Sequence, residues 1–230
     1  MRILLSGQKY FGQEVLRLLL AMGHEVVAVS APPYTEKGRD DRLWTLAGAQ
    51  GLPRMRAGRL NATTMPGGVD LIVCAHSHDF VGDATRRKTK LGGIGYHPSL
   101  LPLHRGRDAV YWTVKMGERV TGGTVYWLSD RVDGGPIAAQ GWCFVRPGIK
   151  PLDLWTEELQ PLGLRLLAGV LKDLQGGRIV AVPQDETLAT WEPSAQRPPL
   201  FKPDLLQIGP PPEGYEVVTA RRGLYEYFGP

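Results

Sequence analysis

The chain has 230 residues, of which 43% are hydrophobic and 22% charged, with a net charge of +4 at pH 7. This length suffices for one compact domain of about 200 residues with an appendage. Because the sequence contains no apolar run of about 20 residues, we expect no membrane-spanning helix. The chain also begins directly with a strand-like segment rather than a signal peptide, so a cytoplasmic location is expected.

The two cysteines, Cys74 and Cys143, lie in apolar, strand-like segments. Two thiols in such surroundings predict neither a disulfide framework nor a thiolate metal site, and no metal is expected. The positive net charge is compatible with an anionic partner but does not identify one. Basic runs at 86–90 and 221–222 are typical of solvated faces, so nucleic-acid binding is not predicted.

The first 30 residues have the pattern of a βαβ unit. Residues 1–6 form a short apolar run, the turn 7–12 follows, and an apolar helix then continues to a stop at Gly23. Residues 25–30 form a second apolar run. A strand–helix–strand order of this kind predicts a parallel sheet with right-handed crossovers.

Further strands and helices are predicted in the middle of the chain. A polar loop at 31–41 precedes a short helix at 43–49, and strands are expected at 69–74 and 92–96. In such a sheet, ligands collect beyond the carboxyl ends of the strands. Several polar residues fall at these ends: His76, Ser77, His78 and His97.

The second half of the chain begins with a helix at 108–116. Residues 121–129 and 137–145 alternate in polarity, which predicts two adjacent antiparallel strands joined through 130–136. A long helix at 152–174 is expected to kink at Pro161. The proline-rich segment after Pro183 is predicted to wrap over the domain. The domain limits are therefore 1–193 for the α/β domain and 194–230 for a C-terminal extension. Two roles are open for the extension, which are to shape a substrate pocket or to join two subunits of a homodimer.

Two residues have the chemistry of a general acid/base pair. His97 ends a strand and is followed by Pro98, which favours a fixed orientation. Asp133 is followed by two glycines, which allow a tight turn that brings a carboxylate close to a neighbouring strand end. A carboxylate beside a histidine fixes its tautomer. Structural roles for both residues stay open on this evidence.

Two motifs at a fixed separation make the chain resemble the 10-formyltetrahydrofolate-using formyltransferases. They are Tyr-His-Pro-Ser-Leu-Leu-Pro at 96–102 and Asp-Gly-Gly-Pro-Ile at 133–137, with His-Arg-Gly at 104–106 between them. The similarity extends from residue 1 to about 193. It implies a Rossmann-like α/β fold with a mostly parallel central sheet, flanking helices and an antiparallel extension. It also implies 10-formyltetrahydrofolate as the formyl donor.

By this resemblance, His97 assists proton transfer and stabilises the oxyanion, and Asp133 orients it and a bound water. The pterin of the cofactor is expected between two loops that comprise His76, Ser77, His78, Asp79, Phe80 and Val81 on one side and Asp130, Arg131 and Val132 on the other. Residues expected to face the substrate are Lys9, Tyr10, Gly95, Ser99, Leu101 and Arg105.

One position departs from the family pattern. Related transferases carry an asparagine two residues before the histidine, whereas this chain has Gly95. The hydrolase domain of 10-formyltetrahydrofolate dehydrogenase also lacks that asparagine, and there water accepts the formyl group. The segment 106–114 instead resembles formylation domains of peptide synthetases, which act on amines. Transfer to a small-molecule amine is therefore the first hypothesis, hydrolysis to formate the second, and a catalytically silent folate-binding module the third.

Two acceptors of related enzymes fit this sequence poorly. The turn at 7–12, Gly-Gln-Lys-Tyr-Phe-Gly, is bulkier than the glycine-rich loop that holds the phosphate of glycinamide ribonucleotide. Residues after Pro193 are too few and too rich in proline to form the β-barrel with which methionyl-tRNA formyltransferases bind tRNA.

Overall fold

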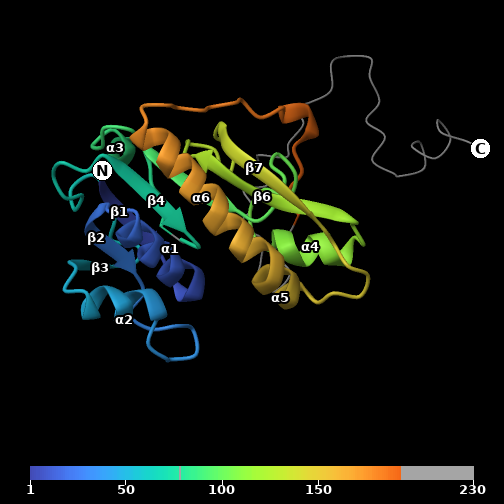
Figure 1. The fold of residues 1–230 in the computed structure, drawn as a ribbon, viewed down its shortest axis with the longest axis horizontal. Helices are drawn as coiled ribbons and strands as arrows, with labels where there is room; N and C mark the ends of the chain where they lie inside the picture. Colours follow the sequence, from blue (N-terminus) through green and yellow to red (C-terminus); the bar gives the residue numbers. More distant parts are fainter. Residues whose placement is uncertain (78, 193–230) are drawn as a thin grey trace, which may run out of the picture. The chain divides into compact units, whose positions relative to one another are not determined.

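The computed structural model describes residues 1–77 and 79–192 and shows a seven-stranded sheet in the order β3-β2-β1-β4-β5-β6-β7 (Figure 1). The first five strands of this order are parallel, and β6 and β7 are antiparallel to their neighbours. The strands are β1 (Arg2–Gly7), β2 (Glu25–Ala31), β3 (Arg54–Arg56), β4 (Leu71–Ala75), β5 (Gly93–His97), β6 (Val120–Trp127) and β7 (Ile137–Phe144). The mostly parallel α/β fold with its antiparallel extension is confirmed.

Both faces of the central strands are buried, which explains their unbroken apolar runs. On β1, Ile3 and Leu5 belong to the larger core, whereas Leu4 belongs to a second cluster on the opposite face. Helix α1 (Lys9–Ala21) and helix α6 (Gln160–Gln175) contribute to the larger core, and α1 also contacts α2 (Arg42–Ala49). Figure 1 shows these helices on one side of the sheet.

The long helix near the C-terminus is irregular where the sequence predicted a kink. It consists of α5 (Pro151–Asp153), a π-helical turn at Leu154–Leu159 and α6, whose second residue is Pro161. Proline has no amide hydrogen and cannot complete the regular helical ladder, so the helix adjusts in the turn that precedes it. Trp155, within this turn, packs its ring against Phe11 of α1.

Three short elements were not predicted from the sequence. Strand β3 has three residues of mostly exposed, basic character, and α3 (Asp83–Arg86) has four. A 3-10 turn at Glu186–Leu188 has three. Elements of this length carry too few residues for a hydrophobic period. The predicted helix at 108–116 is found as α4 (Ala109–Lys115).

The chain after α6 returns along the sheet, as the orange segment of Figure 1 shows. Val182 forms an antiparallel bridge with Ile137 at the start of β7, and Trp191 forms a parallel bridge with Arg105. The predicted wrap is thus confirmed for the part that ends at residue 192. We call residues 178–192 the return segment. The predicted extension 194–230 lies outside the described residues.

Within the described residues, no helix is long and apolar enough to cross a membrane. Cys74 and Cys143 are free thiols, and burial raises the pKa of Cys74 to about 12. Among residues 1–77 and 79–192, no group of histidine, cysteine and carboxylate side chains could hold a metal ion.

Two glycines allow a direct test of how tightly the sheet is packed. A Cβ at Gly122 of β6 would overlap the carbonyl oxygen of Gly141 on β7, whereas a Cβ at Gly169 of α6 has nothing within 4 Å. We expect Gly122→Ala to lower the free energy of unfolding by about 1–3 kcal/mol through overpacking. The matched change Gly169→Ala should raise it by about 0.5–1 kcal/mol, because alanine favours the helix. Urea unfolding of both variants checks this, and a neutral Gly122→Ala would contradict the close approach of the two backbones.

Candidate active site

His97 is the last residue of β5, at the carboxyl edge of the parallel strands. Its ring is 7% exposed, and Nε2 donates a hydrogen bond of 2.7 Å to the carbonyl oxygen of His104. A carbonyl oxygen can only accept, so Nε2 carries a proton. The other ring nitrogen, Nδ1, lies 3.6 Å from Oδ2 of Asp133. The predicted pair is therefore brought together, with Nδ1 as the nitrogen that faces the carboxylate.

The Asp133 carboxylate is fixed from several sides. Oδ2 accepts a hydrogen bond of 2.8 Å from the amide of Gly106, and Oδ1 accepts one of 2.5 Å from the hydroxyl of Tyr126. The backbone of Asp133 has a φ of 49°, a left-handed conformation that aspartate tolerates better than most residues. Its carbonyl oxygen accepts from the amide side chain of Gln184. Both oxygens of the carboxylate thus have defined directions.

This arrangement identifies the ring nitrogen of His97 at which a proton can be exchanged. With Nε2–H committed to the His104 carbonyl, the Nδ1 of His97 is the ring atom free to take up or deliver a proton. A proton on Nδ1 would point toward the carboxylate of Asp133. A separation of 3.6 Å exceeds a hydrogen bond, and such distances commonly shorten when substrate binds.

Arg86 joins the two loops that the sequence assigned to the pterin. Its guanidinium donates to the carbonyl oxygen of Val81 at 2.7 Å and to that of Ser129 at 3.2 Å. It also forms an ion pair of 2.7 Å with Asp130. Arg86 therefore links Val81, at the end of the first loop, to Ser129 and Asp130, at the start of the second. The basic run at 86–90, expected to be a solvated face, contributes this half-buried arginine to the site.

The predicted pterin-loop residues differ in where their side chains lie. Asp79 turns inward and accepts from the hydroxyls of Ser6 and Ser30 and from the amide of Gly58. Ser77 also contacts Ser6, and its hydroxyl accepts from the amide of Asp79. These two side chains thus fix the loop to the ends of β1 and β2. The remaining described members range from buried Val81 and half-buried His76 to exposed Phe80, Asp130, Arg131 and Val132, and His78 lies outside the described residues.

Two of the expected substrate-facing residues support the turn after His97. The hydroxyl of Ser99 donates to the carbonyl of Leu103, and the amide of Leu101 donates to the hydroxyl of Thr124 on β6. Both side chains are buried, at 0% and 2% exposure. Their geometry favours a role in holding His97 in place over direct contact with a substrate.

Lys9 and Tyr10 lie at the start of α1, beyond the end of β1. Lys9 has a φ of 59°, and its amide donates to the carboxylate of Asp41. The ring of Tyr10 is 45% exposed and has the guanidinium of Arg42 over it. Both side chains remain candidates for contact with a substrate that enters from this edge of the sheet.

Arg105 was expected to face the substrate, but its side chain is buried. Its side chain is 2% exposed and contacts the Gln184 side chain and the Glu186 carboxylate, both in the return segment. Its guanidinium also lies 5.6 Å from the ring centre of Trp191. With its donors engaged in this way, Arg105 supports the Asp133 turn through Gln184.

His104 is a second buried histidine that links the site to the return segment. Its Nε2 lies 2.7 Å from a carboxylate oxygen of Glu118, and its Nδ1 lies 2.9 Å from one of Glu192. Burial alone would lower the pKa of His104, but the hydrogen bonds with Glu192 and Glu118 outweigh this, and the pKa is raised. His104, whose carbonyl oxygen accepts the hydrogen bond from His97, is therefore itself held by the carboxylates of Glu118 and Glu192.

The sequence analysis missed three residues that shape the site: Tyr126, Gln184 and Arg86. Tyr126 lies on a strand that was predicted, but only the register of β5 and β6 places it beside Asp133. Gln184 and Arg86 reach the site from segments without a recognisable motif. Their contacts depend on long-range packing, for which local sequence carries no signal.

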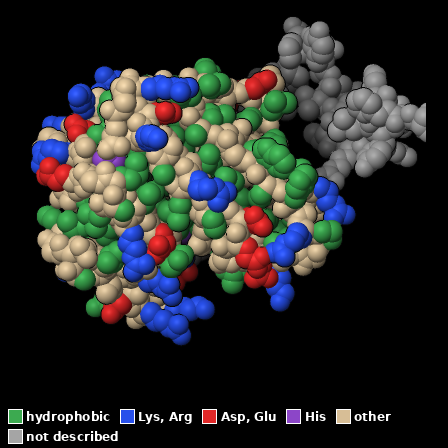
Figure 2. Space-filling view, in the orientation of Figure 1, with side chains coloured by type: hydrophobic (Ala, Val, Ile, Leu, Met, Phe, Trp, Pro, Cys, Tyr) green, Lys and Arg blue, Asp and Glu red, His purple; other side chains and the backbone are tan. Residues whose placement is uncertain are grey.

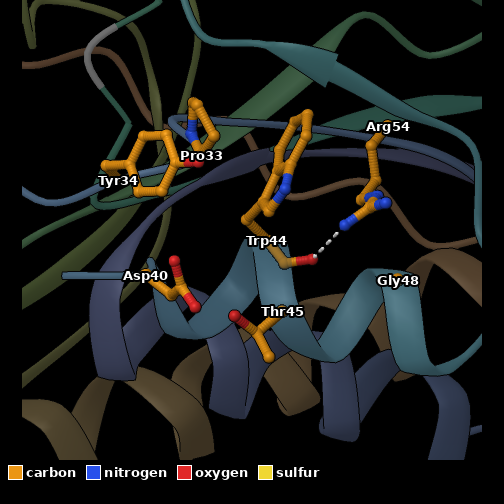
Figure 3. Close-up of a pocket in the computed structure, with 7 residues that line it drawn as sticks. All are labelled: Pro33, Tyr34, Asp40, Trp44, Thr45, Gly48 and Arg54. Carbon is orange, nitrogen blue, oxygen red and sulfur yellow. Dashed lines mark hydrogen bonds between the residues drawn. The ribbon is translucent and has the colours of Figure 1, made fainter.

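A hollow of about 350 Å³ lies away from these residues, between α2 and the loop after β2 (Figure 3). In it, Arg54 donates to the carbonyl oxygen of Trp44 and covers the Trp44 ring at 4.6 Å. The lining contains none of the predicted site residues and comprises Pro33, Tyr34, Asp40, Trp44, Thr45, Gly48 and Arg54.

Comparison with known proteins identifies relatives of the chain. The formyl transferase family model matches residues 53–157, a span that includes both His97 and Asp133. Mouse mitochondrial 10-formyltetrahydrofolate dehydrogenase is 35% identical over 202 residues, which cover 84% of this chain and 22% of the relative. Methionyl-tRNA formyltransferase of Chloroflexus aurantiacus is 36% identical over 200 residues, or 83% of this chain and 64% of the relative.

Solved structures show the same fold. An N-formyltransferase from Helicobacter canadensis, in complex with folinic acid and dTDP-3-aminofucose, superposes with a TM-score of 0.67 at 13% identity, covering 83% of this chain and 70% of that one. Phosphoribosylglycinamide formyltransferase from Bacillus halodurans gives a TM-score of 0.62 at 20% identity, covering 76% and 95%. These features define an α/β domain with a histidine–carboxylate pair at the carboxyl edge of its sheet. The chain carries a formyl transferase domain, and it spans about a fifth of the length of the dehydrogenases that it matches.

The raised pKa of His104 predicts a pH-dependent stability. A group whose pKa is higher in the folded chain stabilises fully below its unfolded pKa of about 6.5 and loses this contribution as the pH rises through the folded value. We therefore expect the free energy of unfolding to fall as the pH rises above about 6.5. His104→Gln should be less stable than the wild type at pH 6 and should lack this fall, which urea unfolding at a series of pH values measures.

His24 provides the matched control, because burial lowers its pKa. His24→Gln should leave the alkaline loss of stability unchanged and alter only the acidic side. Equal pH profiles of wild type and His104→Gln would contradict the assignment.

Proposed function

We propose that this domain transfers the formyl group of 10-formyltetrahydrofolate to the amino group of a small molecule. The observation that carries the proposal is the His97–Asp133 pair, with Nδ1 facing a carboxylate that is fixed by two further donors. A pair oriented in this way, at the edge where ligands of parallel sheets bind, suits proton transfer at a bound substrate.

The choice of donor rests on the relatives and on the two bridged loops. Several relatives are 10-formyltetrahydrofolate dehydrogenases, and the Helicobacter canadensis enzyme was crystallised with folinic acid. The loops 76–81 and 130–133, joined by Arg86, would bracket the pterin. Their backbone groups are the expected contacts, because Asp79 and Ser77 direct their side chains into the domain.

The chemistry assigns a role to each member of the pair. The acceptor amine attacks the formyl carbon and forms a new C–N bond, while the carbonyl oxygen becomes an oxyanion. The positive charge of a doubly protonated His97 would stabilise this oxyanion. The ammonium nitrogen then loses a proton, N10 of the folate gains one, and the bond from the formyl carbon to N10 breaks to release tetrahydrofolate. Asp133 would hold the imidazolium and a water that relays the proton.

Hydrolysis to formate is the second candidate, favoured by Gly95. Without an amide donor at this position, the oxyanion lacks one stabilising hydrogen bond, and loss of such a donor typically costs about 100-fold or more in rate. The dehydrogenase relatives make water a reasonable acceptor. A silent folate-binding module comes third, because such a module has no need for an oriented His97–Asp133 pair.

A small acceptor fits the charge distribution better than a nucleic acid. On the face shown in Figure 2, lysine and arginine side chains lie among acidic ones and do not gather in one continuous patch. Nucleic-acid binding relies on a concentrated basic surface. The cytoplasmic location and a homodimer remain predictions from the sequence.

The experiment that tests the function follows tetrahydrofolate release from 10-formyltetrahydrofolate by absorbance. Release that requires an added amine, with N-formylated product identified by mass spectrometry, supports the transferase. Steady release of formate without an amine supports the hydrolase. No turnover with water or with any amine, despite binding of the folate, would support the silent module and contradict the proposal.

Removal of either member of the pair should abolish turnover without loss of the fold. We expect His97→Ala and Asp133→Asn each to lower kcat by about 100-fold or more, because general acid–base catalysis typically contributes about 10²–10⁴-fold. Circular dichroism and thermal unfolding monitor the fold. Wild-type kcat in either variant would contradict the mechanism.

A further inference from the structure

Tyr126 of β6 lies directly opposite Gly95 of β5 in the antiparallel pairing. A Cβ built on Gly95 would lie 3.2 Å from both Cε1 and the hydroxyl oxygen of Tyr126. Contacts this short require the neighbour to move. The Tyr126 side chain therefore covers the place from which a side chain at position 95 would extend.

The hydroxyl of Tyr126 makes one strong contact. It donates to Oδ1 of Asp133 at 2.5 Å, and the residue is only 9% exposed. Burial and then the charge of Asp133 raise the pKa of Tyr126 well above its ordinary value. The hydroxyl thus keeps its proton at physiological pH and remains a donor to the carboxylate.

The single hydroxyl hydrogen of Tyr126 limits the role that this residue can have in the reaction. A tyrosine hydroxyl has a single hydrogen, and here Asp133 accepts it. The same hydrogen cannot at once stabilise an oxyanion on the substrate. Any effect of Tyr126 on the reaction must therefore pass through Asp133.

We infer that Tyr126 is a positioning residue that holds the Asp133 carboxylate toward His97 and occupies the space that the missing side chain at Gly95 leaves open. The inference rests on the proposed function. With Oδ1 held by Tyr126 and Oδ2 by the amide of Gly106, the carboxylate cannot rotate, and Oδ2 stays directed at Nδ1 of His97. Gly95 and Tyr126 then form a linked pair, in which the glycine makes room for the tyrosine.

Tyr126→Phe removes the hydroxyl and keeps the ring. We expect kcat to fall about tenfold or more, since a hydrogen bond to a charged group is lost, and KM for the folate to stay within about twofold. An unchanged kcat, or a KM for the folate that rises in step with the fall in kcat, would overturn the inference.

Tyr96→Phe is the matched control, because it removes an equally buried hydroxyl from the neighbouring strand. The Tyr96 hydroxyl donates to the carbonyl of Leu159, away from Asp133. This variant should lose stability but keep kcat within about twofold of the wild type. If both variants lowered kcat equally, the effect would be a general consequence of loosened packing, and the inference would fail.

The linked pair is tested by a double-mutant cycle. Gly95→Asn in the wild type should lower kcat, because the new side chain displaces the Tyr126 ring. In a Tyr126→Ala background, the remaining close neighbour of a Cβ at position 95 is the flexible end of the Leu128 side chain at 3.3 Å, and the same Gly95→Asn change should raise kcat. The same decrease in both backgrounds would show that the two positions are not linked.

A crystal structure of Tyr126→Phe separates this inference from the proposed function. The carboxylate of Asp133 should turn away from His97 in the variant, and an unmoved carboxylate would overturn the positioning role whatever the activity. Absence of turnover in the wild type would instead overturn the proposed function.

Discussion

The carboxylate of Asp133 is the group on which the arrangement of the site depends. A carboxylate removed from water must be compensated by hydrogen bonds, or its burial is strongly unfavourable. Two groups donate to this carboxylate, the hydroxyl of Tyr126 on β6 and the amide of Gly106 in the turn after β5. Gln184 of the return segment donates to the backbone carbonyl of Asp133 and so holds the turn. The left-handed backbone of Asp133 is kept in place by the same contacts.

The return segment connects this carboxylate to the histidine that it faces. Arg105 binds Gln184 and Glu186, and its neighbour His104 lies between Glu118 and Glu192. The His104 carbonyl accepts a hydrogen bond from Nε2 of His97. The return segment therefore helps to orient both His97 and Asp133. Residues far from the reacting atoms thus contribute to the site through a continuous chain of hydrogen bonds.

The site compensates for a position without a side chain. Gly95 lacks the amide that related transferases place near the oxyanion, and Tyr126 fills part of that space without supplying a free hydrogen. In the proposed mechanism, stabilisation of the oxyanion would fall mainly to His97, which makes the fixed direction of Asp133 more important.

The sequence by itself determined the fold class, most strands and helices, and the His97–Asp133 pair. Short, unbroken apolar runs predict buried parallel strands, and two motifs at a fixed separation identify a histidine and a carboxylate that would act together. It also predicted a substrate role for Arg105 and the irregular helix near Pro161. Only the tertiary structure decided that Arg105 is buried among Gln184 and Glu186, that Asp79 turns inward, and that Tyr126 covers Gly95. The physical reason is that the spacing of hydrophobic residues along the chain predicts each helix or strand locally. Strand register and hydrogen-bond partners instead depend on segments that meet only when the chain has folded.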